Sequence, residues 1–286
     1  MKVLILDAYN LMHRARSGFQ KGDWPVVYNF FRSLRPLVGK FNPDVIYFVL
    51  EGTPKRNLEL LPNYKGSRAV DPVVDPKKHE ALVNFHRQKD VIIELMENYL
   101  PVVCVQHPDY EADDVMAELA HQHEGDKVAL VSGDSDMLQV LQETSWVKLW
   151  HPIKKEFLKA PDYNYVTWKA LRGDSTDDIP GIPGVGDVTA TKLVTEPTLM
   201  EARFARSPGD RDIFKRNLDL VQLHRLGDDM LTLNVRPGMI DWDELKEAFA
   251  SFGFRSMLKE KTWEKYIATF ECVTQMPTKE ELLSNE

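Results

Sequence analysis

The chain has 286 residues, 43% of them hydrophobic and 28% charged, a composition that excludes disorder for most of its length. No apolar run approaches the roughly 20 residues that a membrane-spanning helix requires, which excludes a membrane protein. The formal net charge of −8 argues at first sight against nucleic acid as a partner.

The first 150 residues alternate short apolar runs with patterns of helical period. Strands are expected at residues 2–6, 45–50, 102–105, 128–132 and 144–150. Helices are expected at residues 24–38, 77–99, 109–121 and 137–142. This alternation predicts an α/β fold, with a mainly parallel twisted sheet and helices on both faces. In such a sheet the ligand site lies beyond the carboxyl ends of the strands.

The strand signal fades after about residue 160, and the remainder is expected to be mostly helical. We therefore divide the chain into an α/β core over residues 1–160 and a helical region over residues 161–286. A Gly/Pro cluster at residues 179–186 interrupts the helical pattern of residues 163–195. The cluster predicts two helices joined by a glycine-rich hairpin.

The hairpin is a candidate phosphate-binding element. Gly181, Gly184 and Gly186 permit positive φ and close approach of a ligand, and the helix that follows presents its N-terminus to an anion. Thr189 and Lys192 of that helix are further candidate contacts. Such an element contacts backbone and not base edges, so it would bind DNA without sequence preference. A plain turn between two helices is the alternative.

Carboxylates follow four successive predicted strands, which places them at one edge of a parallel sheet. They are Asp7, Glu51, Glu111, Asp113, Asp114, Asp134 and Asp136, with Asp174, Asp177 and Asp178 before the Gly/Pro cluster. A single acid after a strand is usually a helix cap or turn residue, but capping does not require this repetition. Like charges 4 Å apart repel by about 4 kcal/mol at an effective dielectric near 20, so the cluster needs protons or cations. An all-oxygen set predicts two Mg²⁺ or Mn²⁺ ions, which suit phosphodiester hydrolysis.

Basic residues gather between residues 55 and 89, where eight Lys and Arg face four acids, a local charge of +4. For residues 77–89 an ordinary solvated helix face is the alternative. Tyr64, Lys65 and Arg68 directly follow an acid-bearing strand, and Tyr64 is suited to stacking on a base or sugar. Arg14 follows the first acidic strand end and is a candidate phosphate contact.

Five segments carry a resemblance to a known family. They are LILDAYNLMHRA (4–15), LLPNYKGSR (60–68), EADDVMAELA (111–120), VSGDSDMLQVL (131–141) and LRGDSTDDIPGIPGVGDVTATKLV (171–194). With these segments the chain resembles the 5′ nuclease superfamily, which includes phage and cellular flap endonucleases and the 5′-exonuclease domain of bacterial DNA polymerase I. The resemblance implies a PIN-like core, a helical arch at about residues 65–100 that admits 5′ single strands, and a helix-hairpin-helix at about residues 164–195, which in the family often holds K⁺.

The resemblance also implies roles for individual residues. Lys65, Asp113 and Asp134 would be catalytic, with Lys65 and Arg68 at the base of the arch and Tyr64 stacking near the cleaved nucleotide. Two metal ions would be held by Asp7, Glu51, Glu111, Asp113, Asp114, Asp134, Asp136, Asp174 and Asp177. Contacts to DNA would come from Arg14, Tyr64, Lys65, Arg68, Gly181, Gly184, Gly186, Thr189 and Lys192.

Two acids depart from the family pattern. Glu51 stands where the family usually has Asp, and its spacing to Tyr64 is one residue shorter; Asp178 stands where Asn is common, which favours a capping role.

The sequence thus predicts a two-metal 5′ nuclease that cleaves 5′ flaps and free 5′ ends of DNA, and RNA in RNA–DNA hybrids, during replication and primer removal. Two alternatives are a non-catalytic DNA-binding protein on the same scaffold and a single-strand ribonuclease with a related compact domain. A haloacid-dehalogenase-type phosphatase would need a second acid in DAYN (7–10), which has one.

The N-terminal MKVLILDAYN does not have the pattern of a signal peptide. Cys104 and Cys272 lack metal-type spacing and suggest a reduced, cytoplasmic setting. The protein is also expected to be a monomer. The nine predicted metal residues also account for the acidic balance: without them 35 acids face 36 bases.

Overall fold

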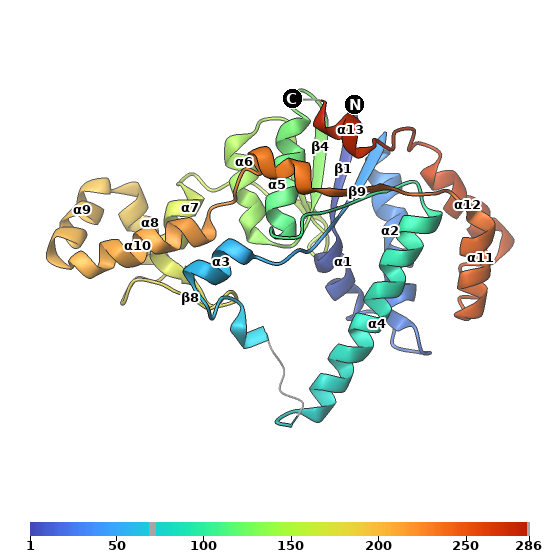
Figure 1. The fold of residues 1–286 in the computed structure, drawn as a ribbon, viewed down its shortest axis with the longest axis horizontal. Coiled ribbons are helices and arrows are strands. Elements are labelled where there is room, and N and C mark those ends of the chain that lie inside the picture. The colour runs from blue at the N-terminus through green and yellow to red at the C-terminus, as the bar shows by residue number, and fades with distance from the viewer. Residues whose placement is uncertain (69–72, 285–286) are drawn as a thin grey trace.

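A computed structural model describes residues 1–68 and 73–284 of the chain. Its centre is a seven-stranded sheet in the order β6-β5-β4-β1-β2-β3-β9 (Figure 1). Five strands are parallel: β1 (Lys2–Asp7), β2 (Val45–Leu50), β3 (Val103–Gln106), β4 (Lys127–Val131) and β5 (Val147–His151). Two short antiparallel strands close the edges, β6 (Glu156–Phe157) on β5 and β9 (Asn234–Pro237) on β3.

Alternate residues of the central strands enter two separate cores, so helices cover both faces. Leu4 and Leu6 of β1 pack with Phe48 of β2 into one core, whereas Val3 and Ile5 enter the other. The helices that contribute to the first core are α1 (Ala8–Ala15), α2 (Pro25–Phe41), α4 (Pro76–Tyr99), α11 (Trp242–Ser251) and α12 (Glu260–Phe270). Those of the second are α5 (Ala112–Gln122), α6 (Leu138–Glu143) and α13 (Lys279–Leu283).

A helical lobe lies at one end of the molecule (Figure 1). It consists of α7 (Tyr165–Arg172), α8 (Asp187–Thr195), α9 (Pro197–Arg206) and α10 (Pro208–Val221). Leu171, Ile182, Ala190 and Phe204 form its small core. Between α7 and α8 the chain makes a two-stranded hairpin, β7 (Gly173–Asp174) with β8 (Ile179–Pro180).

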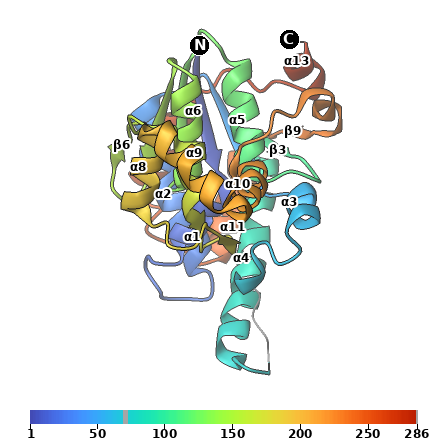
Figure 2. The same cartoon turned by 90° about the vertical axis from the view of Figure 1, so that its left-hand side faces the viewer.

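Helix α4 projects from the body in both views (Figures 1 and 2). Its buried side chains begin at Phe85, so the first nine residues of the helix contribute none. Between β2 and α4 lie α3 (Lys55–Leu60) and the short η1 (Gly66–Arg68). The predicted arch at residues 65–100 includes residues 69–72, which are outside the described residues.

The predicted α/β class and its mainly parallel sheet are confirmed. After residue 160 the described chain is mostly helical, as expected, but it also adds β9, which pairs with β3 at the edge of the sheet. The helical lobe itself ends at Val221, and α11 and α12 pack into the first core. No helix in the described part of the chain has the length and apolarity for a membrane span.

Candidate metal centre

Three carboxylates from two elements meet at the carboxyl edge of the sheet. Asp113 lies in the first turn of α5. After β4, Asp134 directly precedes the short helix η2 (Ser135–Met137), and Asp136 lies within that helix. One oxygen of each lies within 4.8 Å of the others. Asp134 also caps η2, because its Oδ1 accepts from the Asp136 amide at 2.9 Å. This half-buried, all-oxygen donor set fits a hard divalent cation.

Asp7 lies beside this cluster at the end of β1. Its Oδ1 accepts from the Asn10 amide at 2.9 Å and its Oδ2 from Ser132 Oγ at 2.6 Å, so the carboxylate is held in place. Burial, with a contribution from Asp134, raises the pKa of Asp7 to about 6. Burial raises the pKa of Asp113 well above its usual range, and Asp134 and Asp7 add to that rise. A cation that replaces these protons would relieve the same repulsion.

Glu51 reaches the same edge from β2. Its Oε2 accepts from the amide of Ala112 at 3.2 Å, at the N-terminus of α5. Burial and then the charge of Glu111 raise the pKa of Glu51 to about 7. Gly52 lets the chain after β2 pass close to the chain after β3, because a Cβ on Gly52 would lie 1.9 Å from the His107 carbonyl oxygen.

A basic flank formed by Tyr64, Lys65 and Arg68 faces Glu111 and Asp177. Lys65 Nζ forms an ion pair with Glu111 and lies 3.9 Å from Asp177 Oδ2, while Arg68 pairs with Asp177. Burial alone would lower the pKa of Lys65, but these carboxylates raise it, so Lys65 stays charged at neutral pH. Lys65 itself has a φ of +54° and its amide donates to the Asp177 carbonyl at 3.0 Å, which fixes the flank to the hairpin.

Tyr64 does not have the environment expected of a stacking aromatic. It is only 6% exposed and packs against Ala170, Ile179 and Leu220. Its hydroxyl donates to Glu111 Oε2 at 2.8 Å. In this structure the ring is thus a buried support for Glu111, and no base can reach its face.

Lys169 is a site residue that the sequence reasoning missed. Its Nζ bonds Asp136 and lies 2.7 Å from Asp174 Oδ2, and the residue is 3% exposed. Burial opposes ionisation of Asp174, but Lys169 lowers its pKa to about 2. Burial, with a contribution from the neighbouring Asp134, raises the pKa of Asp136 to about 7 despite the same lysine. The sequence held one signal for this residue. Lys169 stands four residues after Tyr165 in a helix, so the two side chains share one face, and that face is buried.

Asp114 and Asp178 lie apart from the three gathered carboxylates. Asp114 Oδ1 accepts from the His224 amide at 2.8 Å and so ties α5 to the segment after α10. Asp178 has a φ of +58°, and its Oδ2 accepts from the Ser67 amide at 2.8 Å. Both acids therefore serve as anchors in this structure.

The glycine-rich hairpin between α7 and α8 is closely packed. A Cβ on Gly181 would lie 1.9 Å from the Arg172 carbonyl oxygen, and Gly184 has a φ of +75°. Gly186 caps α8 without a side chain, which leaves the N-terminal amides of that helix open. A groove of about 560 Å³ runs along Gly181 and Gly186. Thr189 is half-buried and Lys192 exposed on α8.

A parallel sheet with this acidic centre at its carboxyl edge defines a class of divalent-metal α/β proteins. The family model of the 5′-3′ exonuclease N-terminal resolvase-like domain matches residues 2–169. The chain belongs to this family.

Two curated relatives extend the comparison. DNA polymerase I of Thermus thermophilus is 31% identical over 248 residues, which are 78% of this chain and 28% of the polymerase. The chain thus spans less than a third of that relative. A 5′-3′ exonuclease of Mycobacterium tuberculosis is 30% identical over 190 residues, 59% of each protein.

Solved structures share the fold. The T5 5′-exonuclease with bound divalent zinc superposes with a TM-score of 0.67 at 19% identity, covering 96% of this chain and 99% of the T5 chain. The catalytic core of Rad2 in complex with a DNA substrate has a TM-score of 0.54 at 15% identity and covers 94% of this chain and 92% of its own.

Proposed function

We propose that the protein is a metal-dependent 5′ nuclease that hydrolyses phosphodiesters at 5′ flaps and free 5′ ends of DNA. The observation that carries this proposal is the meeting of Asp113, Asp134 and Asp136 within 4.8 Å at the sheet edge of a 5′-3′ exonuclease-family fold. RNA in RNA–DNA hybrids is proposed as a second substrate. The protein is proposed to act as a monomer in the cytoplasm, in replication and primer removal. The T5 5′-exonuclease binds divalent zinc ions and the Rad2 catalytic core binds a DNA substrate, which supports these two ligand classes.

The proposed cofactors are two Mg²⁺ ions, with Mn²⁺ as a substitute and K⁺ at the hairpin. Asp113, Asp134 and Asp136 would hold one ion with support from Asp7, and Glu51, Glu111, Asp174 and Asp177 would complete the second. Bound divalent ions supply an activated water and neutralise charge on the phosphate. The clustered oxygens and the raised pKa of Asp7, to about 6, support a cation as the natural occupant.

The protein's own groups orient and stabilise the substrate. Lys65 is charged and only 18% exposed, so its ammonium group acts where little water screens it. We assign Lys65 to the developing charge of the scissile phosphate and Arg68 to an adjacent phosphate. The open amides at the start of α8, with Thr189 and Lys192, are assigned to the backbone of the duplex.

A flap duplex with a labelled 5′ end is expected to be cut in Mg²⁺ and left intact in EDTA, whereas a matched blunt duplex is cut more slowly. The proposed metal centre requires the dependence on Mg²⁺, and the preference for the flap follows from the proposed action on 5′ single-stranded ends. Gel analysis of both substrates over time measures the two cleavage rates. DNA binding without cleavage in Mg²⁺ would instead establish the non-catalytic alternative.

The metal-free protein is expected to lose stability as pH rises from 5 to 8. Asp7, Glu51 and Asp136 have pKa values of about 6, 7 and 7 in the folded chain, against about 4 when unfolded. The folded state therefore holds extra protons between these values, and the free energy of unfolding falls as they leave. Mg²⁺ binds the ionised carboxylates, so it should raise the melting temperature more at pH 8 than at pH 5.

Thermal melting in EDTA and in Mg²⁺ at both pH values checks this expectation. KCl at equal ionic strength is the control for screening. An equal effect of Mg²⁺ at pH 5 and pH 8 would contradict the raised pKa values of the centre.

A further inference from the structure

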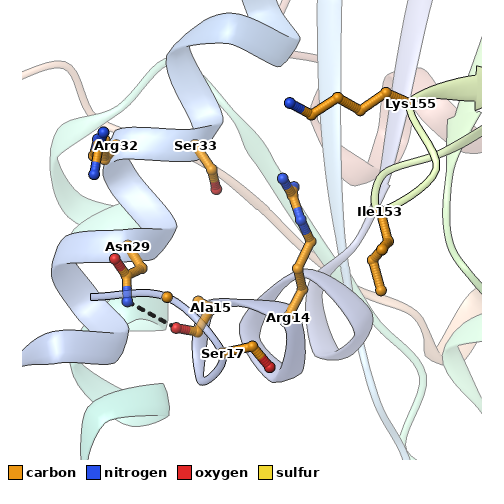
Figure 3. Close-up of a pocket in the computed structure, with 9 residues that line it drawn as sticks. Arg14, Ala15, Ser17, Asn29, Arg32, Ser33, Ile153 and Lys155 are labelled. Atoms are coloured by element: carbon orange, nitrogen blue, oxygen red, sulfur yellow. Dashed lines mark hydrogen bonds between the residues drawn. The ribbon is translucent and has the colours of Figure 1, made fainter. Parts of the chain in front are cut away.

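A basic cavity lies beside the C-terminal end of α1, and none of the nine predicted metal residues lines it. Its volume is about 620 Å³, and its walls are the end of α1, one face of α2 and the turn between β5 and β6. Figure 3 shows Arg14, Ser33 and Lys155 directed into the same space from these three elements. Arg32 of α2 also lines the cavity.

The cations of this basic cavity have no acidic partner. Within residues 1–68 and 73–284, no carboxylate lies within ion-pairing distance of Arg14, Arg32 or Lys155. The lining contains no Asp or Glu at all. Three like charges around one solvent-filled space repel one another, and a bound anion would relieve that repulsion. Guanidinium, ammonium and hydroxyl donors together match the oxygens of a phosphate group.

The cavity is built on a fixed backbone. The buried Asn29 side chain donates to the carbonyl oxygens of Ala15 at 2.9 Å and Phe19 at 3.0 Å, and accepts from the Phe19 amide at 3.1 Å. These bonds hold the loop after α1 against α2 (Figure 3). On the opposite wall, the amide of Lys155 donates to the His151 carbonyl at 2.8 Å, which closes the β5–β6 turn. These bonds fix the backbone positions from which the cationic side chains extend into the cavity.

The position of the cavity relates it to the metal centre. Helix α1 begins directly after Asp7, and Arg14 lies seven residues further along, about 10 Å at 1.5 Å per residue. A strand whose scissile phosphate lies at the metal centre would thus bring another phosphate to the cavity.

We propose that Arg14, Arg32, Ser33 and Lys155 form a phosphate-binding site for the backbone of the substrate strand, beside the metal centre. This inference rests on the proposed nuclease function and extends it to the β5–β6 turn and α2. Its ligand is an internal phosphodiester. A terminal 5′-phosphate has the same chemistry, so the experiment compares the two.

The test is equilibrium binding of a 5′-flap duplex in EDTA, where no cleavage occurs, at several salt concentrations. Lys155→Gln removes one cation of the cavity, and Lys154→Gln is the matched control, because Lys154 is adjacent, exposed and outside the lining. Loss of one phosphate contact lowers the slope of log affinity against log salt by about 0.7 to 0.9. Affinity in 0.1 M salt should then fall by about fivefold to eightfold for Lys155→Gln, and Arg32→Ala should behave likewise. Lys154→Gln should stay near wild type.

Two results would overturn the proposal. Equal salt slopes for Lys155→Gln and Lys154→Gln would show that the cavity binds no phosphate. A loss confined to substrates with a 5′-phosphate, and absent with a 5′-hydroxyl, would replace the internal phosphodiester by a terminal one. Cleavage in Mg²⁺ is scored separately, so a wild-type protein that binds but does not cut would refute the nuclease and leave the phosphate site standing.

Discussion

Replacement of Asp134 by asparagine is expected to slow hydrolysis of a 5′-flap substrate by at least about 10³-fold, or about 4 kcal/mol in activation free energy. Asparagine retains the oxygen that accepts from the Asp136 amide, so η2 keeps its cap. It removes one of three clustered negative charges that attract the cation. Single-turnover cleavage in Mg²⁺ measures the effect, and DNA affinity in EDTA should remain within a few-fold of wild type.

Asp178→Asn is the matched control for this substitution. This substitution makes the same chemical change close to the hairpin. Asparagine tolerates the φ of +58° at this position, and its side-chain oxygen can still accept from the Ser67 amide. The control should cut at close to the wild-type rate. If Asp134→Asn also did so, Asp134 would have to be removed from the proposed metal ligands.

Replacement of Lys65 by alanine is expected to lower the rate of the chemical step by about 10²- to 10³-fold, a larger loss than its effect on DNA affinity. The ammonium group lies between Glu111 and Asp177 with little exposure, so no water-borne cation can take its place at low cost. Single-turnover rates and dissociation constants, measured separately, distinguish stabilisation of the transition state from simple docking.

Lys55→Ala serves as the control, because Lys55 is on the same segment but exposed, with its Nζ 3.9 Å from Asp109. Lys65→Arg should restore part of the rate, since it returns the charge. Losses of equal size in rate and affinity for Lys65→Ala would reduce Lys65 to a contact for binding. Thermal melting of each variant verifies that the flank formed by Tyr64, Lys65 and Arg68 has not unfolded.

The parallel strands of the sheet could be predicted because they are buried on both faces. The segments that became β2 and β3 therefore read as continuous apolar runs, and the acids that follow each strand marked the edge where Asp113, Asp134 and Asp136 meet. Strand β9 could not be found in this way. Its sequence NVRP is mostly exposed, includes a proline, and pairs on one side only, so it lacks the pattern of a buried strand.

Tertiary contacts decided the roles that the sequence did not reveal. Asp113 and Asp114 are neighbours in the chain but point about 100° apart on α5, which sends Asp113 to the metal centre and Asp114 to the His224 amide. The sequence likewise places Tyr64 beside basic residues, but its ring is covered by Ala170 and Leu220 of the helical lobe. Such long-range neighbours are not visible in local spacing.

The return of the C-terminal segment to the sheet has a consequence for how the protein is made. β9 covers the edge of β3, and Phe249 and Trp263 of α11 and α12 complete the core that holds α2 and α4. A nascent chain that has only just exposed the acids of the proposed metal centre still has an open sheet edge and an uncovered apolar face. The α/β core therefore reaches its full set of contacts only after the sequence that follows the helical lobe has left the ribosome.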